Sequence, residues 1–272
     1  MTFFTDSEER RGGRQREDLP ATGAASWLDA ELDSVAGNLA IDEALLDEAH
    51  ESATTGTVVR TWMATKPAVV LGSSSRVDEE VDLAACARLG VEVVRRPTGG
   101  LAVVIGPGCV MWSVIAARPA ATASIETLHA RMLDPLCAAL AAAGRMVVRR
   151  GSSDLAITAV DGDRKVSGNA LRVRRQTLLY HGTLLDSFDL GLVARVLRHP
   201  PREPGYRGGR GHADFLANLH LGRARLEAAV RSAFGAVRTR RAWPGERAER
   251  LMQDRYLNAA WIHRDEAVGP GG

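Results

Sequence analysis

The chain has 272 residues, of which 45% are apolar and 25% charged, and this composition excludes a wholly disordered protein. Its 35 basic and 33 acidic residues leave a net charge of only +2, which gives no electrostatic reason to expect nucleic-acid binding. The longest uninterrupted apolar run, residues 136–143, is too short to cross a bilayer, so no membrane association is expected.

Residues 1–26 mix charges with Gly, Gln and Thr without any period, and we expect a disordered tail there. We expect one folded domain over residues 27–262, a flexible tail over 263–272 and no C-terminal accessory domain. The three cysteines, Cys86, Cys109 and Cys137, lie far apart without the spacing of a metal site. With no apolar leader segment at the N-terminus, they predict reduced thiols in a cytoplasmic protein that has no metal centre of its own.

The first half of the chain alternates one long helix with short apolar strands. In chain order, the pattern predicts a helix capped by Asn38, strands at 57–63 and 68–72, a short helix ending at Gly90, and strands at 91–96, 101–105 and 109–116. Gly90 is suited to the left-handed conformation that ends many helices.

The second half begins with the longest predicted helix, from Ser124 to Gly144, in which Pro135 predicts a kink or a break. There follow strands at 146–148 and 154–160, a type I′ hairpin at Asp161-Gly162, strands at 166–173 and 177–185, a helix at 189–197, a loop at 199–212, and helices at 223–234 and 246–254. Helices and hairpins thus occur in blocks without βαβ alternation. This order predicts an α+β fold with mixed or antiparallel sheets flanked by helices.

One segment with candidate chemistry is the run Arg95-Arg-Pro-Thr-Gly-Gly100, which follows a predicted strand. Glycines let the backbone approach a ligand, and Arg side chains bind phosphate or carboxylate in a bidentate manner. No helix opens after the run, so it is neither a dinucleotide-binding fingerprint nor a Walker loop. On spacing alone, an ordinary turn with exposed arginines is the favoured interpretation, because short glycine loops are common in turns.

A second segment places Lys165 just after the predicted hairpin turn, in Asp163-Arg-Lys-Val-Ser-Gly168. Only two of the 35 basic residues are lysines, which suggests that a compact ammonium is needed at this position. Downstream, His181 and Thr183 fall on one face of a strand. A solvated lysine and a packed histidine are the alternative interpretations.

Taken together and in order, the segments resemble one known family over about residues 27–261. The matching runs include Asn38-Leu-Ala-Ile, Val69-Val-Leu-Gly72, the arginine–glycine run, Ser153-Asp-Leu155, the Lys165 run and His181-Gly-Thr-Leu-Leu185. They are similar to the lipoate–protein ligase A / octanoyltransferase family, which shares its catalytic fold with biotin–protein ligase. The resemblance implies an enzyme that attaches a lipoyl or octanoyl group to a lysine of a carrier domain by way of an acyl-adenylate.

The resemblance also implies roles for individual residues. Lys165 would be the catalytic residue that contacts the acyl carbonyl and the phosphate. The residues implied in acyl and nucleotide binding are Gly72, Arg95, Arg96, Thr98, Gly99, Gly100, Asp154, Ser167, Gly168, Ala170, His181, Gly182 and Thr183. The implied cofactor is ATP, with Mg²⁺ as its nucleotide complex. The implied partners are lipoyl domains of 2-oxoacid dehydrogenases or the glycine-cleavage H protein, with an accessory subunit as a further candidate.

The sequence departs from the family pattern at three places, which leaves alternatives open. The third glycine, the His and the Asp that usually follow the arginine–glycine run are absent, and the family's Gly-Arg-x-Gln turn reads Gly72-Ser-Ser-Ser75. The Gly-Gly-Leu form of the run resembles the amidotransferase branch, but no cysteine precedes Asp154-Leu155, where that branch keeps its nucleophile. An ATP-dependent ligase, an octanoyl or lipoyl transferase that uses an acyl-carrier donor, and a non-catalytic acyl-binding relative therefore all remain.

Overall fold

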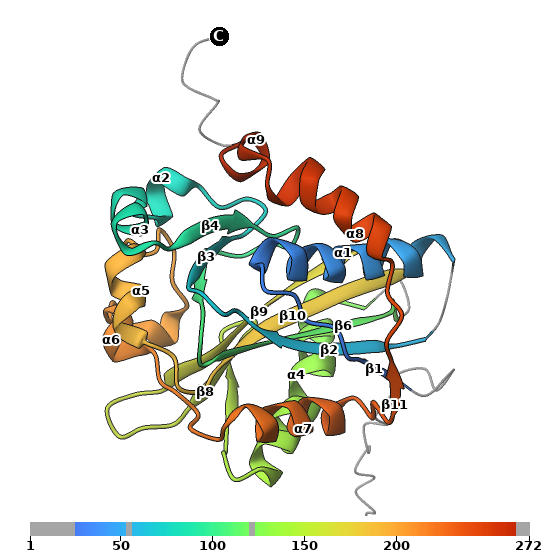
Figure 1. Ribbon diagram of the computed structural model, residues 1–272. Coiled ribbons are helices and arrows are strands. Elements are labelled where there is room, and N and C mark those ends of the chain that lie inside the picture. Colours follow the sequence, from blue (N-terminus) through green and yellow to red (C-terminus); the bar gives the residue numbers. More distant parts are fainter. Residues whose placement is uncertain (1–24, 53–55, 120–122, 265–272) are drawn as a thin grey trace, which may run out of the picture.

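A computed structural model of the chain describes residues 25–52, 56–119 and 123–264, and its strands form one large and one small sheet (Figure 1). The large sheet has the strand order β11 (Arg238–Arg240), β1 (Ser26–Leu28), β2 (Val58–Met63), β6 (Cys109–Ala117), β10 (Thr177–Leu185), β9 (Arg164–Val173), β8 (Asp154–Ile157) and β7 (Val148–Arg150). The small sheet has the order β4 (Glu92–Arg95), β3 (Ala68–Leu71) and β5 (Val103–Ile105).

Both sheets are mixed. β1 runs parallel to β2 and β11, whereas the neighbours from β2 through β7 are antiparallel. In the small sheet, β3 is parallel to β4 and antiparallel to β5. The predicted α+β class with mixed sheets is therefore confirmed. Within the described ranges, no helix is long and apolar enough to span a membrane.

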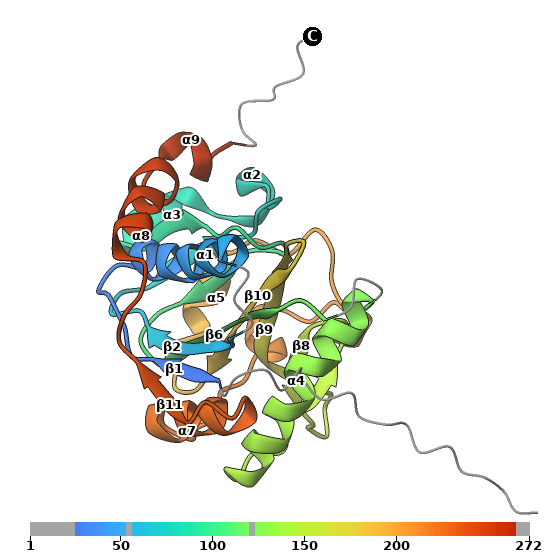
Figure 2. The same cartoon turned by 90° about the vertical axis from the view of Figure 1, so that its right-hand side faces the viewer.

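Helices cover both faces of the large sheet (Figure 2). On one face, α1 (Val35–Glu51) packs against β6 and β10, and α8 (Gly245–Leu251) packs on α1. On the other face, α7 (Arg223–Ala233) contacts β2 and β6, and α4 (Ile125–Ala142) packs on α7 and β7. The side chains between these layers form two separate apolar cores, one on each side of the sheet.

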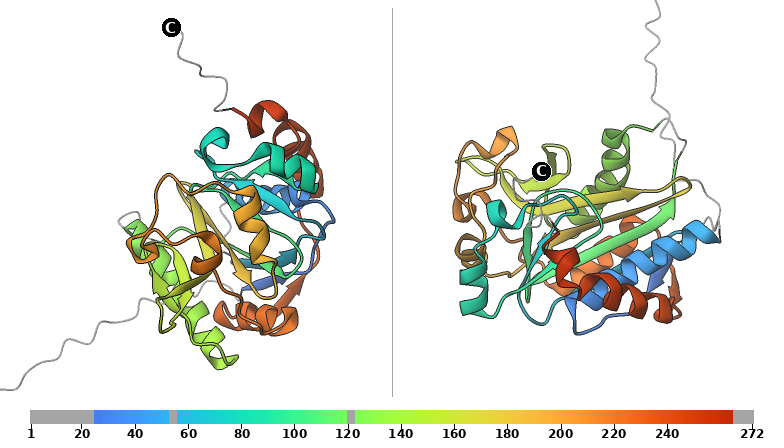
Figure 3. Two further views of the ribbon diagram at one scale, coloured as in Figure 1. Left: turned by 90° about the vertical axis from the view of Figure 1, so that its left-hand side faces the viewer. Right: turned by 90° about the horizontal axis from the view of Figure 1, so that it is seen from above.

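Short helices surround the small sheet and the chain ends. Their bounds are α2 (Val77–Glu80), α3 (Leu83–Leu89), α5 (Leu190–Val196), a 3₁₀ turn (Gly205–Arg207), α6 (His212–Phe215), a π-helical turn (Met252–Tyr256) and α9 (Ala259–Ile262). The view from above shows α8 lying alongside α1 and continuing toward the small sheet (Figure 3). There α9 contacts β4.

The ends of the predicted elements differ from the structure in two places near the N-terminus. The N-cap of α1 is Ser34, whose hydroxyl accepts a hydrogen bond from Gly37 N at 2.9 Å, so the expected cap at Asn38 is wrong. Asn38 lies inside the helix, fully buried, and its side-chain amide binds the Leu32 and Ser34 carbonyls. The fold begins slightly before residue 27, because Ser26 opens β1 and Ala25 is buried. Most of the two expected tails, 1–24 and 265–272, lies outside the described residues.

Two local expectations in the middle of the chain also need correction. The break expected as one possibility at Pro135 does not occur, since α4 runs through it and Met132, Leu133 and Leu136 on both sides are fully buried. A kink at Pro135 stays a prediction. The hairpin at Asp161 is not a two-residue type I′ turn. Such a turn needs positive φ at both central residues, and His220 is the only non-glycine residue with positive φ in the described part of the chain. The last pair before the loop is Ile157 with Arg164, so six residues connect the strands.

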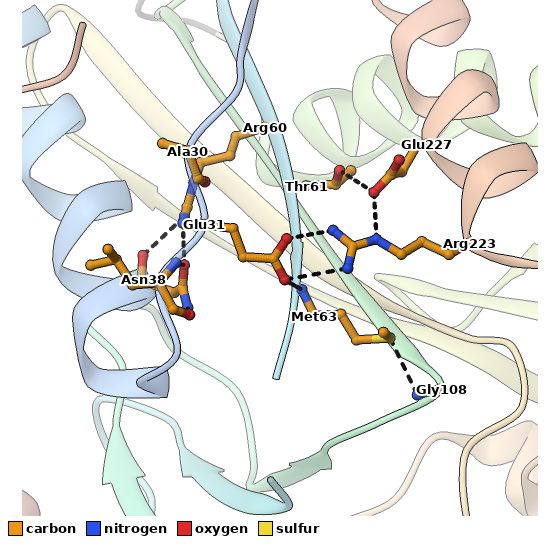
Figure 4. A network of polar contacts seen from close by, with 10 residues as sticks. Ala30, Glu31, Asn38, Arg60, Thr61, Met63, Gly108, Arg223 and Glu227 are labelled. Carbon is orange, nitrogen blue, oxygen red and sulfur yellow. Dashed lines mark hydrogen bonds and ion pairs between the residues drawn. The ribbon is translucent and has the colours of Figure 1, made fainter. Parts of the chain in front are cut away.

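A buried arginine on β2 attaches α1 to the sheet (Figure 4). The guanidinium of Arg60 is fully buried and donates to the carbonyls of Ala30 and Asn38, at 2.9 and 3.0 Å. Its Nη1 also forms an ion pair with Asp42 Oδ1 of α1 at 2.8 Å. Ser113 Oγ of β6 donates to the same carboxylate oxygen at 2.9 Å. These contacts fix the height and rotation of α1 over the strands.

A second network in the same view attaches α7 to the edge of the sheet. Arg223 donates to Glu227 at 2.7 Å and pairs with Glu31, whose carboxylate also accepts from Met63 N. These groups are partly exposed, so we expect them to orient α7 with little effect on the free energy of unfolding.

We predict that Arg60→Leu lowers the free energy of unfolding by about 3–5 kcal/mol, because it leaves the Asp42 carboxylate buried without its cation. Urea denaturation monitored by tryptophan fluorescence measures the change. Arg250→Leu is the matched control: its side chain is 67% exposed, and we expect a change within about 0.5 kcal/mol. Adding Asp42→Asn to Arg60→Leu should restore part of the loss. A double variant less stable than the sum of the single effects would contradict this explanation.

Candidate active site

The floor of the site is the face of β9 and β10 on which His181 and Thr183 project together, as predicted. Ala170 pairs with His181, and Gly168 N donates to Thr183 Oγ1 at 3.1 Å. The pairing of β8 with β9 shifts at a bulge, because Leu155 faces Ser167 while Ala156 faces Lys165. Val166 is the extra residue. A bulge changes the direction of neighbouring side chains, and here it places Lys165 beside Gly168.

Above this floor lies a cavity of about 490 Å³. Its inner end is formed by the buried side chains of Leu39, Met111 and His181, whereas its mouth is formed by the two connecting segments 151–154 and 202–205. Between the two ends, it is lined by Val70, Arg96, Gly100, Leu101, Ala102, Val103, Lys165, Gly168, Asn169, Ala170, Gly182 and Thr183. Most of the inner lining is apolar, so this cavity suits an aliphatic ligand with a polar group at the mouth.

The ammonium of Lys165 is held at the mouth by a carboxylate. Its Nζ lies 2.7 Å from Asp154 Oδ1, and Tyr206 donates to the other oxygen of Asp154 at 2.9 Å. A Cβ at residue 168 would lie 2.9 Å from the Lys165 ammonium, so glycine provides the room for it. Burial and the charge of Asp154 raise the pKa of Tyr206, which therefore stays a hydrogen-bond donor. The result is a positioned positive charge, 23% exposed, facing the cavity.

The roof is the arginine–glycine loop, and its two arginines bind nearby carbonyls. Arg96 donates to the carbonyls of Val70, Gly99 and Leu101, at 2.9, 2.6 and 3.1 Å. Arg95 donates to the carbonyls of Gly72 and Ser75 in the preceding turn and to that of Ile262 in α9. In this structure these side chains bind the backbone of their own chain, and their expected contact with an anion stays a prediction. They order the loop, and Arg96 brings its charge to the cavity wall.

A hydrogen bond connects the roof to the floor. Thr98 Oγ1 accepts from Arg96 Nε at 3.0 Å and lies 2.7 Å from His181 Nε2. Burial and the nearby charge of Arg96 lower the pKa of His181 to about 3, so its imidazole is neutral at physiological pH. Ser75 and Glu80 complete the roof, since Gly72 N donates to Ser75 Oγ and Ala102 N donates to Glu80 Oε2.

A smaller, mostly apolar cavity of about 140 Å³ adjoins the first. Both cavities are lined by Leu101, Ala102, Val103, Lys165, Gly168, Thr183, Arg202 and Pro204. Segment 198–216 forms much of its wall, including the buried Arg207. Lys165 therefore stands where two cavities meet.

Segment 199–212 is mostly a loop, as predicted, and its own hydrogen bonds hold it in place. Arg210 Nη2 donates to the carbonyls of Asp163 and Tyr206, both at 2.8 Å, and Tyr206 binds Asp154 as described. Composition alone could not reveal this, because Gly and Pro mark turns without showing which turns pack on a site.

The structure brings most of the predicted residues together. Those that line the larger cavity are Arg96, Gly100, Asp154, Lys165, Gly168, Ala170, His181, Gly182 and Thr183. Those that do not line it are Gly72, Arg95, Thr98, Gly99 and Ser167, which support the loop or lie buried beneath it. Met111, Tyr206 and the Arg202–Gly205 run were not predicted as site residues. The only sign of them in the sequence is their location, because Met111 lies on an apolar strand and the others lie in a loop.

None of the three thiols reaches this site. Cys109 is fully buried in β6, and desolvation raises its pKa to about 12. Cys86 is buried on α3, and Cys137 is half-buried on α4 with a pKa raised to about 11 by burial. No cysteine is among the described residues that line either cavity. Within the described ranges, there is also no group of three or more His, Cys, Asp or Glu side chains placed to hold a metal ion.

Comparison with known proteins gives a consistent set of relatives. The lipoyl protein ligase A/B catalytic domain family matches residues 34–225. An octanoyltransferase of Carboxydothermus hydrogenoformans is 33% identical over 179 residues, which cover 61% of this chain and 66%, just under two thirds, of that protein.

Two solved structures share the fold. A bipartite lipoate protein ligase of Thermoplasma acidophilum, described together with its E2 lipoyl domain, superposes with a TM-score of 0.74 at 21% identity, covering 88% of this chain and 96% of that one. A lipoate-protein ligase A bound with ATP superposes with a TM-score of 0.75 at 21% identity, covering 88% of this chain and 98% of that one.

We predict that Gly72→Ala disrupts the roof, because a Cβ there would lie 1.8 Å from the carbonyl oxygen of Gly100. Overpacking of this kind typically lowers the free energy of unfolding by about 1–3 kcal/mol. The Ala102 amide, now bonded to Glu80, should exchange with deuterium faster. Gly99→Ala is the control in the same loop, since a Cβ at residue 99 meets nothing within 4 Å. Unchanged stability and exchange in Gly72→Ala would contradict the tight contact.

Proposed function

Since the chain belongs to the lipoyl protein ligase A/B catalytic domain family, we propose that it attaches a lipoyl or octanoyl group to a lysine of a lipoyl carrier domain through an acyl-adenylate. The observation that carries this proposal is the position of Lys165 between two cavities. An acyl-adenylate has an aliphatic chain at one end, a nucleotide at the other, and an acyl phosphate in the middle. The larger cavity suits the chain, and the ammonium stands where the carbonyl and phosphate meet.

Arginine side chains line the smaller cavity. Arg207 is buried there, with its Nε 3.4 Å from Glu203 Oε2 and its guanidinium over the Phe215 ring. Arginine side chains bind phosphate and carboxylate groups strongly. Arg202 lines both cavities beside it. Arg202 and Arg207 are therefore the residues that we propose to hold ATP, with Mg²⁺ bound mainly through the phosphates.

The proposed transfer step needs electrostatic stabilisation more than proton transfer by a side chain. The amine of the carrier lysine attacks the acyl carbonyl carbon, the new C–N bond forms, and the bond from that carbon to the phosphate oxygen breaks. The phosphate leaves with the electron pair, and the amine proton goes to solvent. Lys165, held by Asp154, places positive charge beside the oxyanion and the leaving phosphate without reorganisation. Neutral His181 is too weak a base to take part.

An acyl-carrier-dependent transfer is the second candidate, and the 33%-identical octanoyltransferase favours it. A transfer through a cysteine thioester would require a thiol in the cavity, and Cys109, Cys86 and Cys137 lie elsewhere. A direct transfer from the carrier to the lysine would not require one. The lipoyl domain of a 2-oxoacid dehydrogenase or of the glycine-cleavage H protein remains our proposed acceptor, because a lipoate protein ligase of this fold is described with its E2 lipoyl domain. We further propose a cytoplasmic location, in keeping with three free thiols.

We predict that Lys165→Arg is nearly as damaging as Lys165→Ala, with both lowering the acyl-transfer rate by ~10²–10³-fold. A guanidinium is planar and bulkier, and the space beside Gly168 is matched to a compact ammonium. The test measures acylation of an apo lipoyl domain together with the melting temperature of each variant. Lys66→Arg, on an exposed turn, is the control and should keep full activity. Near-normal turnover of Lys165→Arg would show that this lysine is an ordinary surface charge.

We also predict that a variant with Cys86, Cys109 and Cys137 all replaced by alanine transfers acyl groups within about twofold of the wild-type rate, because no thiolate is needed as nucleophile. Single-turnover rates and intact-mass spectra after incubation with the acyl donor provide the measurement. Cys109→Ser serves as a control for the packing change in β6. Loss of activity in a folded Cys109→Ala protein, or a thioester-linked acyl adduct on the wild type, would favour the thioester route instead.

A further inference from the structure

The short helix α9 contacts β4, the strand that leads into the arginine–glycine loop (Figure 1). It has four residues, and a helix of this length has little stability of its own in water. It also lies outside residues 34–225, the part of the chain that matches the family's catalytic domain. The position of α9 therefore depends on its contacts with the rest of the protein.

Two hydrogen bonds join α9 to Arg95 in opposite directions. The indole Nε1 of Trp261 donates to the Arg95 carbonyl oxygen at 3.0 Å, and Arg95 Nε donates to the Ile262 carbonyl oxygen at 2.9 Å. The Trp261 ring also lies against two guanidiniums, with its centroid 4.7 Å from Arg255 and 4.2 Å from Arg264. These cation–π contacts hold the ring while its N–H binds the end of β4.

A buried carboxylate on α1 holds the segment just before α9. The hydroxyl of Tyr256, in the π-helical turn, donates to Glu43 Oε2 at 2.7 Å, and Arg255 pairs with Oε1 of the same side chain. Glu43 and Tyr256 are both buried. The segment that leads into α9 is thus attached to α1, and α9 itself is attached to the start of the roof.

Arg95 carries the contact from α9 to the cavity wall. Its guanidinium is fully buried, and Nη1 donates to the Gly72 carbonyl at 2.9 Å. From the same turn, Ser73 N donates to the Thr98 carbonyl at 2.7 Å. Gly72 lies so close to the loop that a Cβ there would be 1.8 Å from the carbonyl oxygen of Gly100, which lines the larger cavity. A continuous series of contacts therefore leads from α9 to the wall of this cavity.

We propose that Trp261 is a positioning residue for acyl binding, which acts through Arg95 to hold the roof of the larger cavity in its binding conformation. This inference rests on the proposed function, because it makes α9 part of what sets the affinity for the acyl chain. No described residue of α9 lines either cavity, so the effect is indirect. The Lys165–Asp154 ion pair joins β9 to β8, apart from these contacts. Loosening α9 should therefore weaken acyl binding and leave the transfer step nearly unchanged.

The direct test is Trp261→Phe, which removes the indole N–H and keeps an aromatic ring. Deuterium exchange of the ligand-free full chain should become about two- to tenfold faster in the roof peptide 96–104, the factor that one hydrogen bond makes in an equilibrium constant. The melting temperature should fall by no more than about 4 °C. Trp243→Phe is the matched control: Trp243 packs against the apolar core on the α1 side, and the roof should exchange at the wild-type rate. Unchanged roof exchange in Trp261→Phe would overturn the inference.

Steady-state kinetics separate positioning from general destabilisation. The varied substrate is the acyl donor that supports transfer, either lipoate with ATP or an octanoylated carrier protein. Trp261→Phe should raise KM for this donor about two- to tenfold and keep kcat within about twofold, because it removes binding that the ground state and the transition state share. Trp261→Ala also removes the ring from Arg255 and Arg264, so KM should rise at least as far. A lower kcat at unchanged KM would indicate a smaller folded fraction and contradict a positioning role.

The wild type provides a reciprocal test that needs no variant. Since two coupled sites affect each other equally, saturating lipoate should slow deuterium exchange in peptide 257–264. Faster roof exchange in Trp261→Phe with no acyl transfer from any donor would refute the proposed function and leave the contact between α9 and the roof established. Normal KM in Trp261→Phe, with no response of α9 to lipoate, would refute the positioning role alone.

Discussion

The buried guanidinium of Arg96 is the contact on which the site depends most. Its N–H groups donate hydrogen bonds to three carbonyls and one hydroxyl. These bonds hold the arginine–glycine loop, which has no regular secondary structure, in one conformation above the cavity. Through Thr98 it also holds His181, and its charge helps to keep that ring neutral. A buried cation that binds backbone is stable only with all these acceptors in place, so the roof is ordered as one unit.

The sequence was sufficient for the fold class, for most strands, and for the idea that the Lys165 and His181 segments share one face. Those conclusions rest on periodicity and glycine positions, which are local properties. The sequence could not predict the hydrogen-bond acceptors of Arg95 and Arg96, because composition does not show whether a guanidinium faces a ligand or a carbonyl of its own chain. It also missed the pairing of β1 with β11 and the packing of Tyr206 on Asp154, which join residues far apart in the chain.

The same geometry accounts for the departures from the family pattern. No cysteine precedes Asp154 where a transferase would keep one, yet Asp154 itself forms the ion pair that positions Lys165. The turn at residues 72–75 has lost an arginine, and its serine at residue 75 instead binds Gly72 and Glu80 beneath the loop. What the chain retains is a positioned ammonium beside an apolar cavity, and the proposed acyl transfer rests on these two features.

The most direct test of the account is to identify the acyl donor. Intact-mass spectrometry of an apo lipoyl domain would follow its acylation by the enzyme in parallel reactions, one with lipoate, ATP and magnesium and one with an octanoylated acyl carrier protein. The account predicts a mass increase of one lipoyl group that requires both ATP and the free acid, accompanied by pyrophosphate. Acylation from the carrier protein alone, with no product from lipoate and ATP, would contradict the adenylate route.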